Sequence, residues 1–122
     1  RLIKVVPVDA DQHLRQALRL GAEGINMGCC LCVFPEGERS IDGRLKPFRK
    51  GAAILAKEMG VPVVPTALKG SYEVWARGVD KFRFHPVKLR FGPPVDRPSS
   101  DDSYESYNDR LFQAVDKLIK GD

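Results

Sequence analysis

The stretch from Phe34 to Ser40, with the sequence FPEGERS, holds the residue types in this chain that are best suited to chemistry. Gly37 has no side chain, so a ligand can approach the backbone closely at this position. Arg39 offers a planar fork of donors that suits a phosphate, and Ser40 places a hydroxyl beside it. Together these residues predict an anion-binding loop.

More positive charge follows this stretch. Between positions 39 and 50 there are five cations and a single anion, Asp42. The cations are Arg39, Arg44, Lys46, Arg49 and Lys50. We predict that Arg39 and Lys50 belong to the anion-binding loop, while the other three are also compatible with purely solvated positions.

Two apolar runs and the helix between them are expected to position this loop. The run Cys29 to Val33 predicts a buried strand that ends at Pro35. Helical spacing from Phe48 to Met59 predicts a helix that stops at Gly60. The nearly continuous apolar run Val61 to Leu68 predicts a second buried strand, whose regular part is limited by its two prolines.

The remaining patterns complete an alternation of strands and helices. Leu2 to Val8 and Pro86 to Phe91 have the composition of strands. Apolar spacing predicts a helix from about Asp11 to Ala22, broken by the glycines at its end, and a final amphipathic helix from about Tyr104 to Lys120. The order predicts an α/β domain with a layered, mainly parallel or mixed sheet flanked by helices.

The segment Lys69 to Phe84 mixes aromatic and basic residues with glycines. Such a loop borders a site, faces a membrane, or folds over the core, and composition alone does not choose among these. From Lys69 to Arg90 there are six basic and two acidic residues, so the middle of the chain is its basic part. Anionic lipid, coenzyme A phosphates and nucleic acid all suit such a charge.

The FPEGERS stretch resembles motif III of the glycerolipid acyltransferases, the lysophosphatidate acyltransferase family, whose usual form is FPEGTRS. Glu38 stands where Thr is common. Two further stretches are similar to the same family: FRKGAAILA at Phe48 to Ala56, and VPVVPTAL at Val61 to Leu68, which resembles motif IV. The similarity runs from about the first strand to roughly Pro94.

The family's catalytic signature HxxxxD is not found in this chain. The residues five positions after His13 and His85 are Leu18 and Arg90, so neither histidine supplies it. The resemblance therefore predicts that residues 1–122 are the carboxyl-terminal part of an acyltransferase domain. We expect no catalytic residue within the chain, and no activity from the chain alone.

The resemblance also implies a reaction and roles for the loop residues. A fatty acyl group would pass from acyl-coenzyme A or acyl carrier protein to the hydroxyl of a glycerophosphate or lysophospholipid, activated by an upstream His. Arg39 would hold the acceptor phosphate with Ser40 and Lys50, Gly37 would give it room, and Glu36 would order the loop or bind acceptor hydroxyls. No metal and no cofactor beyond the acyl donor is expected.

A noncatalytic module that grips phosphorylated ligands or anionic membrane is the alternative function. The aromatic residues form no recognisable RNA-binding pattern, so nucleic acid is not an expected partner. No apolar stretch approaches the ~18 residues of a membrane-spanning helix, which predicts peripheral membrane contact. Cys29, Cys30 and Cys32 are expected to be buried, reduced thiols of a cytoplasmic protein, and uncovered apolar surface predicts self-association.

Overall fold

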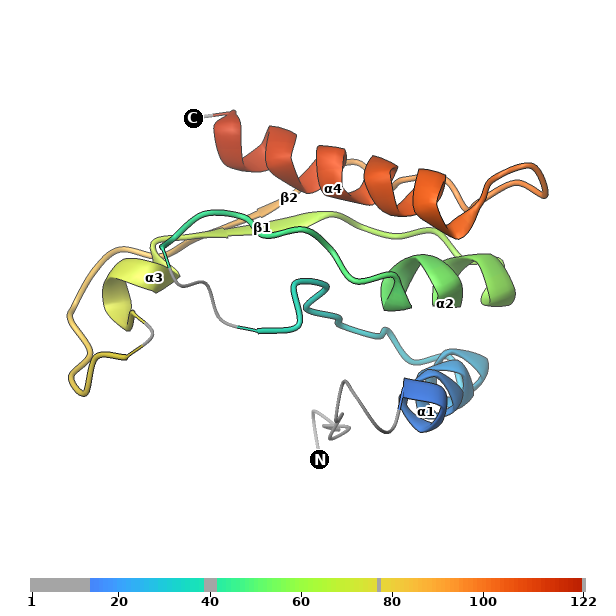
Figure 1. Ribbon diagram of the computed structural model, residues 1–122, viewed down its shortest axis with the longest axis horizontal. Coiled ribbons are helices and arrows are strands. Elements are labelled where there is room, and N and C mark those ends of the chain that lie inside the picture. The colour runs from blue at the N-terminus through green and yellow to red at the C-terminus, as the bar shows by residue number, and fades with distance from the viewer. Residues whose placement is uncertain (1–13, 39–41, 77, 122) are drawn as a thin grey trace.

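The computed structural model describes residues 14–38, 42–76 and 78–121 (Figure 1). Their elements are, in order, α1 Leu14–Asn26, α2 Gly51–Met59, β1 Thr66–Lys69, α3 Ser71–Val74, β2 Lys88–Phe91 and α4 Tyr104–Lys120. The strand predicted at Leu2 to Val8 and the position of His13 lie outside the described residues.

The sheet of the described residues has two antiparallel strands, so the expected parallel pairing is not confirmed. Thr66 pairs with Phe91 and Leu68 with Leu89, and a separate bridge joins Val63 to Val95. The prediction that the two prolines of the Val61 to Leu68 run limit its ladder is correct, because only its last three residues belong to β1. The general α/β character holds, with helices lying against a small sheet (Figure 1).

The core lies where α4 packs against α2 and β1. Tyr107 and Leu111 of α4 are buried against Ala53 and Ala56 of α2. The small side chains of α2 allow this close approach, and Ala67 of β1 is buried as well. The final helix therefore packs back onto the sheet as its apolar stripe predicted.

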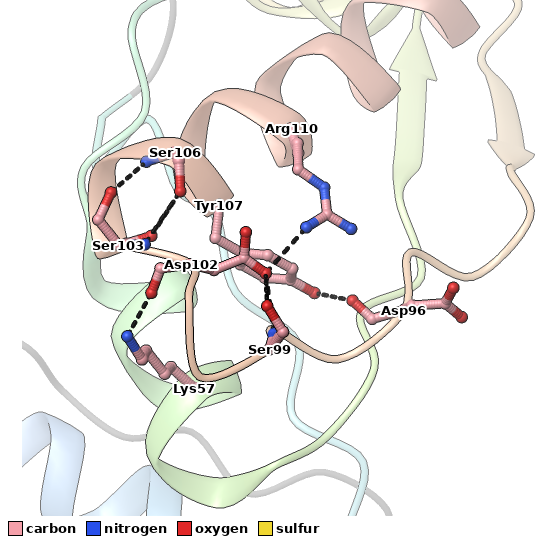
Figure 2. Close-up of polar contacts among 8 residues, drawn as sticks. All are labelled: Lys57, Asp96, Ser99, Asp102, Ser103, Ser106, Tyr107 and Arg110. Atoms are coloured by element: carbon pink, nitrogen blue, oxygen red, sulfur yellow. Dashed lines mark hydrogen bonds and ion pairs between the residues drawn. The ribbon is translucent and has the colours of Figure 1, made fainter.

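Polar contacts fix the start of α4 (Figure 2). The Ser103 and Ser106 hydroxyls each accept a hydrogen bond from the other's backbone N–H, at 3.0 Å, which forms a capping box. The Tyr107 hydroxyl donates to the Asp96 carbonyl at 2.9 Å, and the Lys57 ammonium donates to the Asp102 carbonyl. These bonds tie the helix start to α2 and to the segment before it.

Helix α1 continues past the glycines that were expected to end it. Gly21 lies against the side chains of Leu31 and Leu55, because a Cβ built there would lie 3.1 Å and 3.2 Å from their methyl carbons. The glycine thus serves close packing of α1 against its neighbours. The helix ends before Gly28, which has a φ of +82°.

The run Cys29 to Val33 is not a buried strand, so that prediction is wrong. It belongs to no strand or bridge, and Cys29, Cys30 and Cys32 are free and exposed. Apolar composition predicts burial only where a second surface covers it. The described residues cover this run only in part, because Leu31 lies against Gly21 of α1 while Leu31 and Val33 keep 37% and 41% of their surface exposed. The sheet face that carries Leu68, Leu89 and Phe91 is also exposed.

The segment between the strands closes on itself at its base. Gly70 has a φ of +94°, and a Cβ there would lie 2.1 Å from the Pro86 carbonyl oxygen. Only glycine permits this approach of two backbones. The short helix α3, which the sequence patterns did not predict, begins directly after Gly70.

Candidate phosphate-binding loop

The FPEG residues form a turn whose backbone is held from two sides. The Gly37 N–H donates to the Phe34 carbonyl at 3.1 Å, and the Arg49 N–H donates to the Pro35 carbonyl at 2.8 Å. The second bond joins the turn to the residues that precede α2. The turn is therefore attached to the core through α2, although it is itself at the surface.

Glu36 braces the loop that follows the turn. Its Oε2 accepts a hydrogen bond from the Lys46 N–H at 2.9 Å. The Lys46 ammonium in turn pairs with Glu38 at 2.7 Å. The carboxylate thus performs the loop-ordering role that was one of its two predicted roles, and binding of acceptor hydroxyls stays a prediction.

Gly37 lies directly under the guanidinium arm of Arg49. A Cβ built on Gly37 would lie 2.6 Å from Nε and 2.9 Å from Cδ of Arg49, and the φ of Gly37 is +76°. The glycine gives room to an arginine of the chain itself, and room for a ligand at Gly37 stays a prediction. An exposed cation from the start of α2 therefore lies on the FPEG turn.

The residue before Arg49 is anchored in the core by α4. The Phe48 ring makes an edge-to-face contact with Phe112, with centroids 5.1 Å apart. The Phe48 carbonyl accepts a hydrogen bond from Asn108 Nδ2 at 3.0 Å. These contacts fix the backbone from which Arg49 reaches the turn.

Lys50 points to a different partner. Its ammonium lies 2.6 Å from Glu105 Oε1, at the start of α4. The hydrogen bond from Lys50 is the main reason that the pKa of Glu105 lies below its usual range. The structure thus brings Arg49 to Gly37 and Lys50 to α4, and a role of Lys50 in binding the acceptor stays a prediction.

Arg39 and Ser40 lie outside the described residues, so their predicted roles also stay predictions. Arg49 is the functional candidate that the sequence patterns did not single out. The sequence did contain a signal for such a contact, because a cation-rich stretch follows the glycine of the turn. The sequence does not show which of these cations reaches the glycine.

The loop after the turn continues towards α3. Gly43 lies against the Tyr72 ring, since a Cβ there would lie 3.1 Å from Tyr72 Cδ1. A hollow of about 460 Å³, lined by Gly60, Pro62, Asp96 and Arg97, begins beyond the opposite, carboxyl-terminal end of α2. The FPEG turn contributes nothing to that hollow.

Among the described residues, no group of His, Cys, Asp and Glu side chains is arranged to hold a metal ion. Within the same part of the chain, no helix has the length and apolar character needed to cross a membrane.

Comparison with known proteins supports the resemblance noted in the sequence. The Acyltransferase family model matches residues 1–69. A Limnanthes douglasii protein named 1-acyl-sn-glycerol-3-phosphate acyltransferase is 37% identical over 95 residues, covering 78% of this chain and 33% of that protein. A Mycoplasma pneumoniae protein named probable 1-acyl-sn-glycerol-3-phosphate acyltransferase is 30% identical over 118 residues, covering 88% of this chain and 44% of that one.

A solved structure is similar as well. It is that of the 1-acyl-sn-glycerophosphate acyltransferase PlsC from Thermotoga maritima, with a TM-score of 0.80 and 33% identity, covering 88% of this chain and 45% of that one. The chain thus spans less than half the length of these three relatives. Because the family model matches more than half of its residues, the chain belongs to the acyltransferase family.

Proposed function

We propose that the complete protein carrying this chain transfers a fatty acyl group from acyl-coenzyme A or acyl carrier protein to the free hydroxyl of a glycerophosphate or lysophospholipid. Relatives named 1-acyl-sn-glycerol-3-phosphate acyltransferases support this class of acceptor. The chain's part in the reaction is to hold the acceptor phosphate at the FPEG turn. A lysophospholipid acceptor and the acylated product are lipids, so in this proposal the protein works at a membrane surface, and the location that we propose is cytoplasmic.

The observation that carries the proposal is the position of the Arg49 side chain, which lies directly against Gly37. A guanidinium presents paired donors to phosphate oxygens, and the backbone of Arg49 is held by the Pro35 carbonyl. The first turn of α2 starts two residues later without a side-chain cap from Lys50, and the N–H groups at the start of a helix favour an anion nearby. Arg39, which follows the turn in the sequence, supplies the second cation in this proposal.

The residues of the loop divide the work. Glu36 holds the loop backbone through the Lys46 N–H, and the Lys46 ammonium pairs with Glu38, which offsets the charge of that second carboxylate. The arginines bind and orient the phosphate. Orientation of the acceptor brings its hydroxyl to the base that activates it, and the family resemblance implies a His upstream of this chain for that role.

The test is the kinetics of the complete protein with lysophosphatidate as acceptor. Arg49→Ala is expected to raise the KM for the acceptor about 10- to 150-fold, because a charge-assisted hydrogen bond contributes ~1.5 to 3 kcal/mol. The KM for the acyl donor is expected to stay unchanged. Arg39→Ala is expected to act in the same way, and Arg49→Lys to restore part of the affinity because it keeps the charge but not the fork.

A matched control is Arg19→Ala, which removes an exposed arginine of α1 that pairs with Glu23 at 3.6 Å. It should change neither KM. An Arg49→Ala protein that folds and keeps its acceptor KM would remove Arg49 from the site. If the complete protein binds lysophosphatidate but transfers no acyl group from either donor, the noncatalytic phosphate-binding module is the correct function.

A further inference from the structure

The loop between α3 and β2 exposes a group of large apolar side chains. We call residues 75–76 and 78–87 the docking loop. Phe84 is 100% exposed and Phe82 64%. Trp75, Val79 and Val87 are also exposed, each to about half of its surface. Isolated exposed apolar residues are ordinary, whereas five within thirteen positions are the concentration expected of an interaction surface.

These side chains are presented by an ordered backbone. The Arg83 N–H donates to the Val74 carbonyl at 2.6 Å, which ties the Phe82 to Phe84 segment to α3. The two phenylalanine rings contact each other edge to face, with centroids 6.2 Å apart. The base of the loop is closed where Gly70 meets Pro86. The loop thus holds both rings on one projecting tip.

The polar atom of the tryptophan is already satisfied within the loop. Trp75 Nε1 donates to the Val79 carbonyl at 2.7 Å. The exposed part of this side chain is therefore mainly its apolar ring surface. An apolar environment around the ring would leave no unpaired donor behind.

Positive charge alternates with the aromatic rings at the tip. Residues 81–84 read Lys-Phe-Arg-Phe, and Lys88 follows at the start of β2, against the single acidic residue Asp80. Aromatic rings favour the boundary between lipid headgroups and acyl chains, and cations beside them meet the phosphates of anionic lipids. The interleaving of the two types at one tip matches the layered chemistry of an anionic bilayer surface.

The docking loop lies at the same end of the molecule as the loop that follows the FPEG turn. Tyr72 of α3 contacts Gly43, so the two segments are neighbours. In Figure 1, α3 and the docking loop project beyond the ends of β1 and β2, next to the part of the chain that leads from the turn to α2. A membrane that contacts the docking loop would therefore lie on the side of the molecule that carries Gly43, in the loop that follows the FPEG turn.

We propose that the docking loop binds the surface of an anionic lipid bilayer and so presents the phosphate-binding loop to acceptors in that bilayer. The second part of this statement rests on the proposed function. The first part stands on the exposed rings, the cations and the closed base of the loop.

Trp75 gives a local test, because it is the one tryptophan in these 122 residues. The complete protein is mixed with vesicles of phosphatidylcholine containing 30 mol% phosphatidylglycerol, with or without brominated acyl chains. Brominated chains are expected to quench the Trp75 emission, taken as the difference from a Trp75→Phe protein. If the protein sediments with the vesicles while this emission is unquenched, its membrane contact lies elsewhere and the proposal is overturned.

Variants test the two kinds of contact separately. Lys81→Ala with Arg83→Ala should weaken binding to the anionic vesicles about 30-fold, since each cation near such a surface contributes ~1 kcal/mol. Phe82→Ser with Phe84→Ser should weaken binding to anionic and neutral vesicles alike. The matched controls are Arg15→Ala with Lys117→Ala for charge and Met27→Ser for an exposed apolar residue, and both should bind as the parent does. The proposal is overturned if the control variants lose as much vesicle binding as the docking-loop variants. It is also overturned if the docking-loop variants bind vesicles as the parent does and lose self-association instead.

Activity separates this proposal from the proposed function. The docking-loop variants should lose acyl transfer to lysophosphatidate embedded in vesicles but keep it with a short-chain acceptor dissolved as monomers. Absence of transfer with both acceptors in the parent protein would refute the acyltransferase function and leave the vesicle-binding result to stand on its own. Equal loss with both acceptors in the docking-loop variants would show that these residues act inside the site, which contradicts docking.

Discussion

Gly37 is the residue at which conformation and chemistry meet most directly. Its positive φ disfavours any side chain, and the space beside its Cα is filled by Arg49. Position 37 therefore has to be glycine for two reasons. The backbone of the turn requires a positive φ, and the Arg49 side chain occupies the space that a Cβ would fill.

A pair of glycine variants separates these two reasons. Gly37→Ala should strain the turn and push the Arg49 side chain away, so the acceptor KM should rise at least as much as in Arg49→Ala. Gly28→Ala is the matched control, because Gly28 has a similar φ of +82° but no atom within 4 Å of the added Cβ. Both should lose ~1 kcal/mol or more of stability in denaturant titrations. A Gly37→Ala protein with the acceptor KM of the parent would show that Arg49 is not needed where it lies.

At this scale the sequence singled out Gly37 of the turn and gave loop ordering as one of two roles for Glu36, but it did not single out Arg49, which lies on the turn. Glycine and proline act through local geometry, which short motifs record. The choice between Arg49 and Lys50 depends on Glu105, which is 55 positions away and pairs with Lys50. No pattern within the FPEGERS stretch contains that information.

Among the elements, α4 is the one that organises the others. Its residues bury α2, cover β1 and hold the Phe48 carbonyl, so a single helix connects the core to the residue before Arg49. The bounds predicted for it agree with the structure because its apolar stripe and its polar start are both local signals. The end of α1 was predicted wrongly because Gly21 packs closely against Leu55, and this tertiary contact overrides the low helix propensity of glycine.

The start of α4 should make the stability of the chain depend on acidic pH. Asp102 accepts hydrogen bonds from the Ser99 N–H at 2.8 Å and from Arg110 at 3.1 Å, and the Ser99 N–H is the main reason that its pKa lies below the usual value. Because the folded-state pKa is lowered, this stabilisation is present above the ordinary pKa of about 3.9 and is lost as the pH falls through the lower, folded-state value.

Replacing the carboxylate tests that dependence. The Asp102→Asn protein should be less stable than the parent at pH 7, and the difference between the two should shrink below about pH 4. Denaturant titrations at several pH values measure it. Asp101→Asn is the control, since Asp101 is an exposed neighbour for which the structure gives no such hydrogen bonds. A difference between parent and Asp102→Asn that is the same at pH 3 and pH 7 would contradict the assignment.

Across the whole molecule, the described residues leave two apolar surfaces open in addition to the docking loop. One is the run Cys29 to Val33, and the other is the sheet face that carries Leu68, Leu89 and Phe91. Sequence patterns predicted Cys29 to Val33 and Val61 to Leu68 as buried strands, but the first run forms no strand and Leu68 of the second is exposed. An apolar pattern indicates that burial would stabilise a segment, but it does not identify the surface that covers the segment in the folded protein.

The three exposed cysteines allow the exposure of the Cys29 to Val33 run to be measured. In the isolated 122-residue chain, Cys29, Cys30 and Cys32 should react with a thiol reagent without denaturant. In the complete protein, we expect the same thiols to react at least tenfold more slowly, because apolar surface of this extent is covered in stable proteins. The isolated chain should also self-associate in light scattering and show no acyl transfer. Monomeric behaviour with robust turnover would overturn both expectations.

The close approach of the Gly70 and Pro86 backbones has a consequence for changes in the length of the segment between β1 and β2. The register of β1 and β2 is set by the pairing of Lys69 with Lys88, so the residues between them can change in number without shifting any side chain of the sheet. Lengthening such a closed excursion is thermodynamically inexpensive, at about 0.6 kcal/mol for each doubling. We therefore expect insertions and deletions in this segment to leave the pairing of β1 with β2 intact. If the docking loop binds a bilayer as proposed, a change in this segment would alter the membrane contact while the pairing of β1 with β2 stays the same.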